Sequence, residues 1–211
     1  LDYSLEGKTG ETAVEVKKNP EYTIFIEIDE NMLYLLQEGK CIKKYPVATG
    51  KRDTPSPLGS WRIIEKGDWG EGFGGYWMGL NVPWGKYGIH GTTSPSSIGR
   101  YASHGCIRMR NQDIAELYKI VPHGTRVVIE KGTFGPFGTG FRNLNPGDRG
   151  ADVMEIQIRL AELGYFKGYL SGIYDDNLKH ALHQFQRDKG LPVTNTITKA
   201  AWKAMGFMEF E

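Results

Sequence analysis

The sequence predicts a mainly β domain that carries one helix, followed by a small domain of three helices. Short runs of aromatic and β-branched residues fill residues 21–131, and clusters of Gly and Pro separate them. Residues 131–147 contain five Gly and two Pro and lack periodicity, which is typical of a linker, and we place this linker at residues 132–143. Apolar residues then recur at helical spacing through residues 144–211. The polar residues 1–20 form the expected N-terminal arm.

Each strand of the β domain is predicted by an apolar run that ends at a turn signal. The expected strands are residues 22–28, 32–36, 41–48, 59–65, 76–82, 87–91 and 125–130. The single helix follows Asn111, which we expect to be its N-cap, with Asp113 in the first turn. Ile114, Leu117 and Val121 share one face of this helix, and the following proline ends it.

Three apolar stripes at a spacing of three to four residues predict the helices of the second domain. The stripes are Val153, Ile156 and Leu160, then Leu178, Leu182 and Phe185, and finally Ile197, Ala201 and Met205. Asp175 and Thr194 are the expected N-caps, and Gly164 and Gly190 the expected helix stops.

Charge and composition exclude several classes of protein. The chain has 26 basic and 25 acidic residues, so its net charge of +1 gives no electrostatic basis for general nucleic-acid binding. No run approaches the ~20 apolar residues that a membrane-spanning helix needs. The two cysteines, Cys41 and Cys106, make neither a disulfide framework nor a Cys-x-x-Cys site.

The strongest chemical signal combines a cysteine, two histidines and a turn that contains glycine. His90 ends a predicted strand, and Ser103-His104-Gly105-Cys106 forms a turn further along the chain. A thiol attacks only as the thiolate, and a neighbouring imidazole can take its proton. Gly105 allows a tight turn whose backbone N–H groups can bind the oxyanion of a tetrahedral intermediate. The pattern indicates acyl transfer through a thioester on Cys106.

Alternatives exist for both residue types in this pattern. A lone cysteine is most often a small buried hydrophobic residue, and we expect this role for Cys41 because it lies in a predicted strand. His104 is only two residues from Cys106 and is therefore the rival of His90 as the base. The tight turn predicts that the ring of His104 points away from the thiol.

His90-Gly91-Thr92 followed by Ser103-His104-Gly105-Cys106-Ile107-Arg108 resembles the signature of the bacterial L,D-transpeptidases, the YkuD-type catalytic domain. Thr54-Pro55-Ser56-Pro57-Leu58-Gly59 is similar to a further segment of that family, and the resemblance extends from about Tyr22 to Lys131. The family often has Asn two positions after the nucleophile, where this chain has Arg108. The resemblance implies a mainly β sandwich.

The resemblance also implies a two-step reaction on peptidoglycan that uses no cofactor. Cys106 would attack the carbonyl of the third residue of a tetrapeptide stem and expel the terminal D-alanine. The side-chain amine of another stem's third residue would then resolve the thioester and crosslink the two third residues. Water in place of the amine would give an L,D-carboxypeptidase or a stem-peptide hydrolase. A non-catalytic wall-binding protein is the third alternative, and only an enzyme of this family would form a carbapenem adduct on Cys106 and none on Cys41.

The resemblance gives each residue of the signature a role. Cys106 is the nucleophile, and His90 matches the general base. The carbonyl of Gly91 orients the imidazole, and the N–H groups of His104, Gly105 and Cys106 bind the oxyanion. Ser103 and Arg108 brace the turn at the substrate, and Arg108 alternatively binds a stem carboxylate.

Residues 144–207 resemble a second family, the three-helix peptidoglycan-binding module. The matching segments include Leu144-Asn145-Pro146-Gly147-Asp148-Arg149-Gly150 and Gly172-Ile173-Tyr174-Asp175. We therefore expect peptidoglycan as the partner and an extracytoplasmic, cell-wall-associated location in a bacterium. The chain begins at Leu1 rather than Met and shows no signal peptide, as expected after removal of a leader.

Two remaining features each have a structural explanation beside a functional one. His180 and His183 lie three residues apart on a predicted helix, but no further ligand stands at metal spacing, so we expect no metal. Trp69, Trp77 and Trp84 lie among Gly-rich segments and are expected either to line a substrate groove or to pack in the core.

Overall fold

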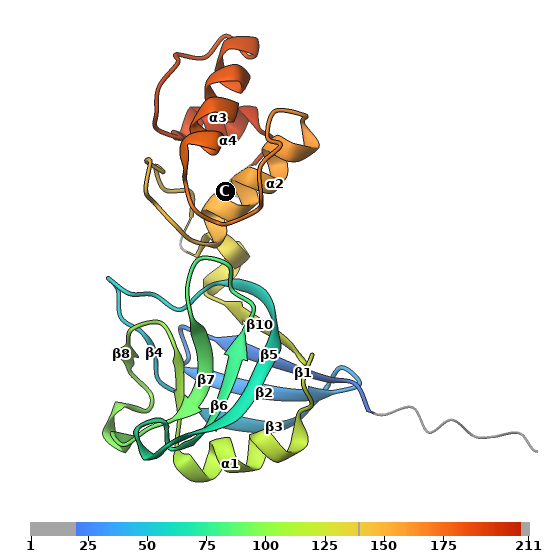
Figure 1. Cartoon of the computed structure of the whole chain (residues 1–211), viewed down its shortest axis with the longest axis vertical. Helices are drawn as coiled ribbons and strands as arrows, with labels where there is room; N and C mark the ends of the chain where they lie inside the picture. Colours follow the sequence, from blue (N-terminus) through green and yellow to red (C-terminus); the bar gives the residue numbers. More distant parts are fainter. Residues whose placement is uncertain (1–19, 139, 208–211) are drawn as a thin grey trace, which may run out of the picture.

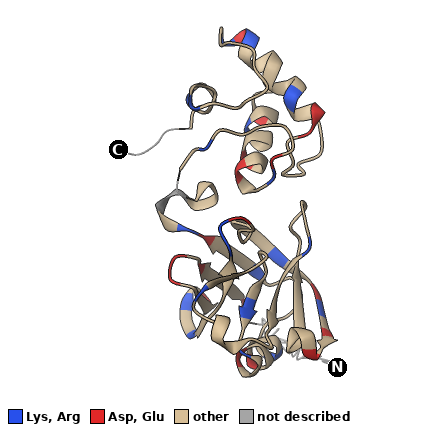
Figure 2. Cartoon of the chain, turned by 90° about the vertical axis from the view of Figure 1, so that its left-hand side faces the viewer, with Lys and Arg blue, Asp and Glu red and all other residues tan. Residues whose placement is uncertain are grey.

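A computed structural model describes residues 20–138 and 140–207, in which a β domain and a helical domain stand end to end (Figure 1). Except for its last residue, the expected N-terminal arm at residues 1–20 lies outside the described residues. Among the described helices, none has both the length and the apolar character that crossing a membrane requires. Lys and Arg residues are interspersed with Asp and Glu over both domains (Figure 2), in keeping with the near-zero net charge.

The β domain is built on an eight-stranded sheet with the order β3-β2-β1-β10-β5-β6-β7-β9. Its strands are β1 (Tyr22–Glu27), β2 (Met32–Gln37), β3 (Lys40–Pro46), β5 (Gly59–Gly70), β6 (Gly75–Leu80), β7 (Tyr87–Gly91), β9 (Ile107–Met109) and β10 (Arg126–Glu130). A separate pair consists of β4 (Thr49–Gly50) and β8 (Tyr101–Ser103). The seven predicted strands are all present. β4, β8 and β9 were not predicted, because two or three residues are too few to show alternation.

The long strand β5 joins the two halves of the sheet, because its first residues pair with β10 and its later residues pair with β6. Figure 1 shows the half that contains β1 to β3 behind the half that contains β5 to β7. Side chains from both halves, such as Ile24, Ile63 and Ile89, are fully buried in one core. The mainly β, two-layer fold expected from the sequence is therefore confirmed, with the layers formed by one bent sheet.

Helix α1 (Asn111–Ile120) packs against β6 and β7 and buries Ile114 and Leu117. The expectation that Asn111 caps this helix is wrong, since Arg110 holds the N-cap position and makes no side-chain capping bond. The Asn111 side chain instead accepts a hydrogen bond from the backbone N–H of Thr92, with 2.9 Å between N and Oδ1. The start of α1 is thereby tied to the chain that follows β7.

The helical domain contains the three predicted helices, α2 (Ala151–Glu162), α3 (Asp176–Asp188) and α4 (Lys199–Ala204). Their predicted apolar stripes form its core. Asp175 caps α3 as expected, because its side chain accepts from the N–H of Leu178 at 2.9 Å. Thr194 does not cap α4, since Thr198 fills that position and the N–H of Thr194 donates to Gln186.

Three short 3₁₀ segments complete the chain: η1 (Glu71–Phe73), η2 (Pro95–Ser97) and η3 (Gly132–Phe137). The segment expected to be a linker, residues 132–143, begins with η3 and contributes aromatic rings to the helical core. The ring centroids of Phe137 and Phe141 lie 5.7 and 5.1 Å from that of Trp202. These contacts attach the segment to the helical domain.

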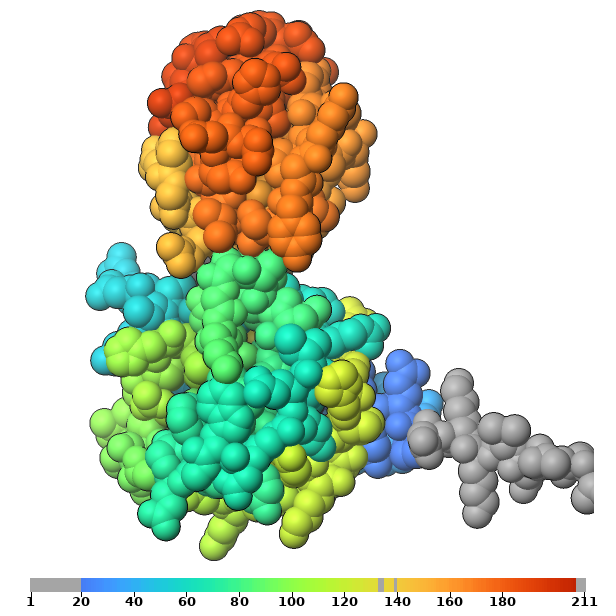
Figure 3. All heavy atoms as spheres, in the orientation of Figure 1, coloured from blue at the N-terminus to red at the C-terminus, as the bar shows by residue number. Residues whose placement is uncertain are grey.

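The two domains touch at the loop between β6 and β7 (Figure 3). Trp84 in this loop packs edge-on against Trp61 with 5.1 Å between ring centroids, and it is almost fully buried. Gly172 of the helical domain lies so close that a Cβ there would be 2.2 Å from the Trp84 ring. Met154 and Ile173 also pack against the β core. The interface is therefore an apolar contact between folded parts.

Candidate active site

Two neighbouring parallel strands bring the cysteine and the histidine of the sequence motif together. Strands β7 and β9 pair with Ile89 opposite Ile107 and His90 opposite Arg108. Cys106 directly precedes β9, so the register of the two strands sets it beside Gly88 of β7. The thiol is half-buried at this position. The register thus brings Cys106 beside the strand that carries His90.

His90 is held in one orientation by its own backbone and by aromatic rings. The side chain is 7% exposed, and its Nδ1 lies 2.6 Å from the carbonyl oxygen of Gly91. Because a carbonyl oxygen can only accept, Nδ1 must carry a proton, which leaves Nε2 of the neutral ring with a free lone pair. The rings of Phe73 and Trp77 pack against the imidazole with centroid distances of 5.1 and 5.7 Å.

The turn before the nucleophile is closed by Ser103. The Ser103 hydroxyl donates to the carbonyl of Cys106 at 2.6 Å and accepts from the N–H of Gly105 at 3.0 Å. Gly105 has φ +112°, and a Cβ there would lie 2.6 Å from the Tyr87 ring, so only glycine fits. In this structure the N–H of Gly105 is occupied by Ser103. The expectation that Gly105 supplies an oxyanion donor stays a prediction, and the N–H groups of His104 and Cys106 are the other candidates.

Burial favours the neutral forms of both the Cys106 thiol and the His90 imidazole. Burial raises the pKa of the Cys106 thiol, while the backbone of Gly88 and the positive charge of Arg108 oppose this rise. Burial lowers the pKa of His90, the hydrogen bond to Gly91 opposes this, and Arg108 lowers it further. At neutral pH the pair is therefore a thiol beside a neutral imidazole. Such a pair can transfer the thiol proton to the imidazole during attack.

Arg108 and His104 are the other predicted residues near Cys106 and His90. Arg108 stands opposite His90 in the sheet, and its backbone pairs with Ala48 through two hydrogen bonds of 2.8 and 2.9 Å. His104 is exposed and lines a cleft between the two domains. The expectation that Cys41 is buried is wrong, because β3 is an edge strand of the sheet and the Cys41 side chain is exposed.

Sequence reasoning missed the residues that support the site from behind. Gly91 leaves no space for a side chain, since a Cβ there would lie 2.7 Å from Oδ1 of Asn111. A Cβ on Gly88 would similarly lie 2.5 Å from the ring of Trp77. The two glycines that flank Ile89 and His90 are a sequence signal for such close approach. No signal in the sequence connects Asn111 to the strand that it braces.

No metal centre is evident in the described part of the chain. Among residues 20–138 and 140–207, no three His, Cys, Asp or Glu side chains come together as a metal ion would require. His183 lies 3.0 Å from the side-chain oxygen of Asn195, and His180 lies 3.2 Å from the side-chain nitrogen of Gln184.

Comparison with known proteins supports both domains. Residues 21–129 match the family described as "L,D-transpeptidase catalytic domain" (YkuD), and residues 149–205 match the family described as "Putative peptidoglycan binding domain". Two relatives are named "Putative L,D-transpeptidase YkuD". The Bacillus licheniformis protein is 44% identical over 53% of this chain and 69% of its own length. The Bacillus subtilis protein is 45% identical over 52% and 66%.

The chain thus spans about two thirds of the length of these two relatives. Among solved structures, the NMR structure of the catalytic domain of the Enterococcus faecium L,D-transpeptidase is similar to this chain. The two are 24% identical with a TM-score of 0.46, over 52% of this chain and 96% of the solved one.

Proposed function

Since the chain belongs to the YkuD family of L,D-transpeptidase catalytic domains, we propose that it crosslinks peptidoglycan stems through a thioester on Cys106. The donor is a tetrapeptide stem whose third residue is a diamino acid that presents an L-centre. The acceptor is the side-chain amine of the third residue of another stem. The product is a crosslink between two third residues, with release of the terminal D-alanine.

In the first step, Cys106 Sγ attacks the carbonyl carbon of the donor's third residue. The thiol proton passes to Nε2 of His90, which is free because Nδ1 donates to the carbonyl of Gly91. The N–H groups of His104 and Cys106 hold the oxyanion of the tetrahedral intermediate. The bond to the D-alanine nitrogen then breaks, and His90 returns the proton to that nitrogen. The acyl group remains on Cys106 as a thioester.

In the second step, the acceptor amine attacks the thioester carbon. His90 takes a proton from the attacking nitrogen, the C–S bond breaks, and the thiolate of Cys106 recovers the proton. The resting enzyme has a neutral thiol and a neutral imidazole, which supports proton transfer during the attack rather than before it. Water in place of the amine gives hydrolysis, which is the carboxypeptidase alternative.

The observation that carries the proposal is the fixed imidazole on β7, whose protonated Nδ1 is bound to Gly91 while Cys106 opens the adjacent strand β9. The test is product analysis of the purified protein with a defined tetrapeptide stem. A dimeric stem linked through its third residues, with one D-alanine released per crosslink, is the expected product. Only shortened monomers would indicate a hydrolase instead, and an unchanged stem would favour a non-catalytic protein.

The helical domain supports peptidoglycan as the partner, because it matches a family described as peptidoglycan binding. A domain that holds the wall raises the local concentration of stems at the catalytic turn, so weak binding at a single site suffices. An extracytoplasmic location at the bacterial cell wall is consistent with both domains. Deletion of residues 144–211 should therefore lower the activity on intact sacculi more than the activity on soluble stems.

A further inference from the structure

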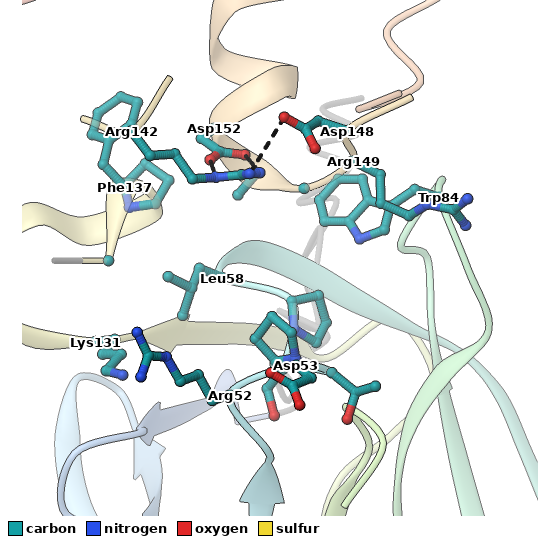
Figure 4. A pocket seen from close by; sticks show the side chains of 18 of the residues that line it. Arg52, Asp53, Leu58, Trp84, Lys131, Phe137, Arg142, Asp148, Arg149 and Asp152 are labelled. Atoms are coloured by element: carbon teal, nitrogen blue, oxygen red, sulfur yellow. Dashed lines mark hydrogen bonds and ion pairs between the residues drawn. The ribbon is translucent and has the colours of Figure 1, made fainter. Parts of the chain in front are cut away.

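The helical domain and the β domain together enclose a cleft of about 760 Å³ beside the catalytic turn. One wall comes from residues 52–58 together with Trp84, Tyr87 and His104 of the β domain. The opposite wall comes from residues 147–152 at the start of the helical domain. In Figure 4, Arg149 lies above the cleft and near Trp84, and Arg52 lies below it. The cleft therefore exists only because the two domains are docked.

Two residues that line the cleft, His104 and Tyr87, belong to or contact the turn that carries Cys106. His104 lies next to Gly105 in the turn, two residues from Cys106. Tyr87 packs directly on the turn, since a Cβ on Gly105 would lie 2.6 Å from its ring. Trp84 lines the same cleft and lies against Gly172 of the helical domain. A ligand in the cleft would thus lie against the same turn that carries Cys106.

The charges of the cleft divide into a neutralised cluster and unpaired cations. Arg142 is held by Asp152 at 2.6 Å and by Asp148 at 3.5 Å. Arg52 and Arg149 are exposed, and neither makes an ion pair within the described part of the chain. Arg149 lines the cleft together with Tyr87 and Trp84.

Apart from the cluster around Arg142, the lining contains three cations and one carboxylate, Asp53. Lys131 is the third cation, and its closest carboxylate, Asp29 at 4.0 Å, lies outside the lining. This excess of cations, two of them guanidinium groups, suits a ligand that carries carboxylates, because planar carboxylates accept paired hydrogen bonds from arginine.

We propose that this interdomain cleft binds a carboxylate-bearing peptidoglycan stem, with Arg149 of the helical domain and Arg52 of the β domain at its carboxylates. The inference rests on the proposed transpeptidase function and adds a role to the helical domain. That domain supplies an arginine to a cleft that His104 of the turn also lines, in addition to holding the wall. The stem in the cleft is either the acyl donor or the acceptor, and the two steps of the reaction distinguish them.

The test replaces Arg149 in the full-length chain and uses two soluble stems. One stem is a tetrapeptide with free carboxylates, and the other is the same peptide with carboxamides in their place. In R149Q we expect KM for the free stem to rise about five- to tenfold with kcat little changed, since one charge-assisted hydrogen bond is lost. KM for the amidated stem should not change, and R149K should recover part of the affinity.

R187Q is the matched control, because Arg187 is an exposed arginine of α3 that does not line the cleft. It should leave both KM values unchanged. Thioester formation and aminolysis of the preformed thioester are measured separately: a selective effect on the first identifies the stem as donor, and on the second as acceptor. Equal behaviour of R149Q and R187Q in both steps would overturn the inference. A wild-type protein that forms no thioester would instead refute the proposed function.

Discussion

The hydroxyl of Ser103 donates to the backbone carbonyl of Cys106 across the catalytic turn, with 2.6 Å between the two oxygens. The same hydroxyl accepts from the N–H of Gly105, so one buried side chain fixes two backbone groups of the turn. Cys106 and the amides beside it are therefore positioned before any substrate binds. This order is what an oxyanion site requires, since its donors must not reorganise during the reaction.

Removal of the Ser103 hydroxyl should slow acylation. In S103A the turn loses both hydrogen bonds, and a loss of about 1–2 kcal/mol of positioning corresponds to roughly a tenfold lower rate of thioester formation. Single-turnover mass spectrometry with a tetrapeptide stem measures this rate. S97A is the matched control, because Ser97 also bonds a backbone carbonyl at 2.6 Å but lies in η2, away from the turn. Equal rates in the two variants would contradict the role of Ser103.

Substitution of Gly105 should destabilise the protein through crowding as well as through φ. In G105A the new Cβ meets the Tyr87 ring at 2.6 Å and the Pro55 carbonyl at 3.1 Å. We expect a loss of about 2–4 kcal/mol in the free energy of unfolding, measured by denaturant titration, since strain and overpacking add. Gly99 has φ +82° with nothing within 4 Å, so G99A reports the cost of φ alone and should be milder.

The lowered pKa of His90 and the raised pKa of Cys106 predict a specific pH dependence. Thioester formation should fall on acidification only below the ordinary imidazole pKa of 6.5, because His90 must be neutral to accept the proton. Alkylation of Cys106 by iodoacetamide should rise with pH and have its midpoint above the ordinary thiol value of 9.0. The exposed Cys41 also reacts, so both profiles are measured in a C41S background.

Arg108 should shift these two profiles in the same direction. Its charge lowers the pKa of Cys106 and that of His90, so its removal in R108Q should raise both. The acidic limb of thioester formation and the midpoint of alkylation should each move to higher pH. R110Q, at an exposed arginine just past β9, serves as the control and should move neither. A shift of only one profile in R108Q would disagree with this electrostatic role.

The contact between Trp84 and Gly172 should decide whether the two domains stay docked. In G172A a Cβ would lie 2.2 Å from the Trp84 ring, and φ +64° adds strain. The domains should therefore separate while each keeps its own core. Small-angle scattering would record a larger radius of gyration. G164A, at φ +85° with nothing within 4 Å, should keep the compact arrangement. Identical scattering from G172A and the unmodified chain would count against a rigid interface.

Local patterns in the sequence were sufficient to predict the longer strands and the helices. In β1, for example, the buried residues Ile24 and Ile26 alternate with partly exposed ones. This alternation can be recognised from the residue types alone. Asp175 likewise predicts the start of α3, because its residue type is favoured at the N-cap. Both features depend on neighbours along the chain.

Features that depend on distant residues could not be read in this way. The exposure of Cys41 follows from the place of β3 at the edge of the sheet, which only the strand order decides. The hydrogen bond that the N–H of Gly105 donates to the Ser103 hydroxyl depends on the shape of the turn. The cleft between the domains depends on how Trp84 meets Gly172, and neither residue carries a signal for that contact.

The intact mass of the protein after brief incubation with a tetrapeptide stem tests the central claim most directly. The unmodified chain and H104A should both gain the mass of the acyl group on Cys106, whereas H90A should gain little or none. C106A should remain unmodified and thereby locate the adduct. Acylation that survives in H90A but disappears in H104A would contradict the assignment of the base, and an unmodified wild-type protein would contradict the thioester itself.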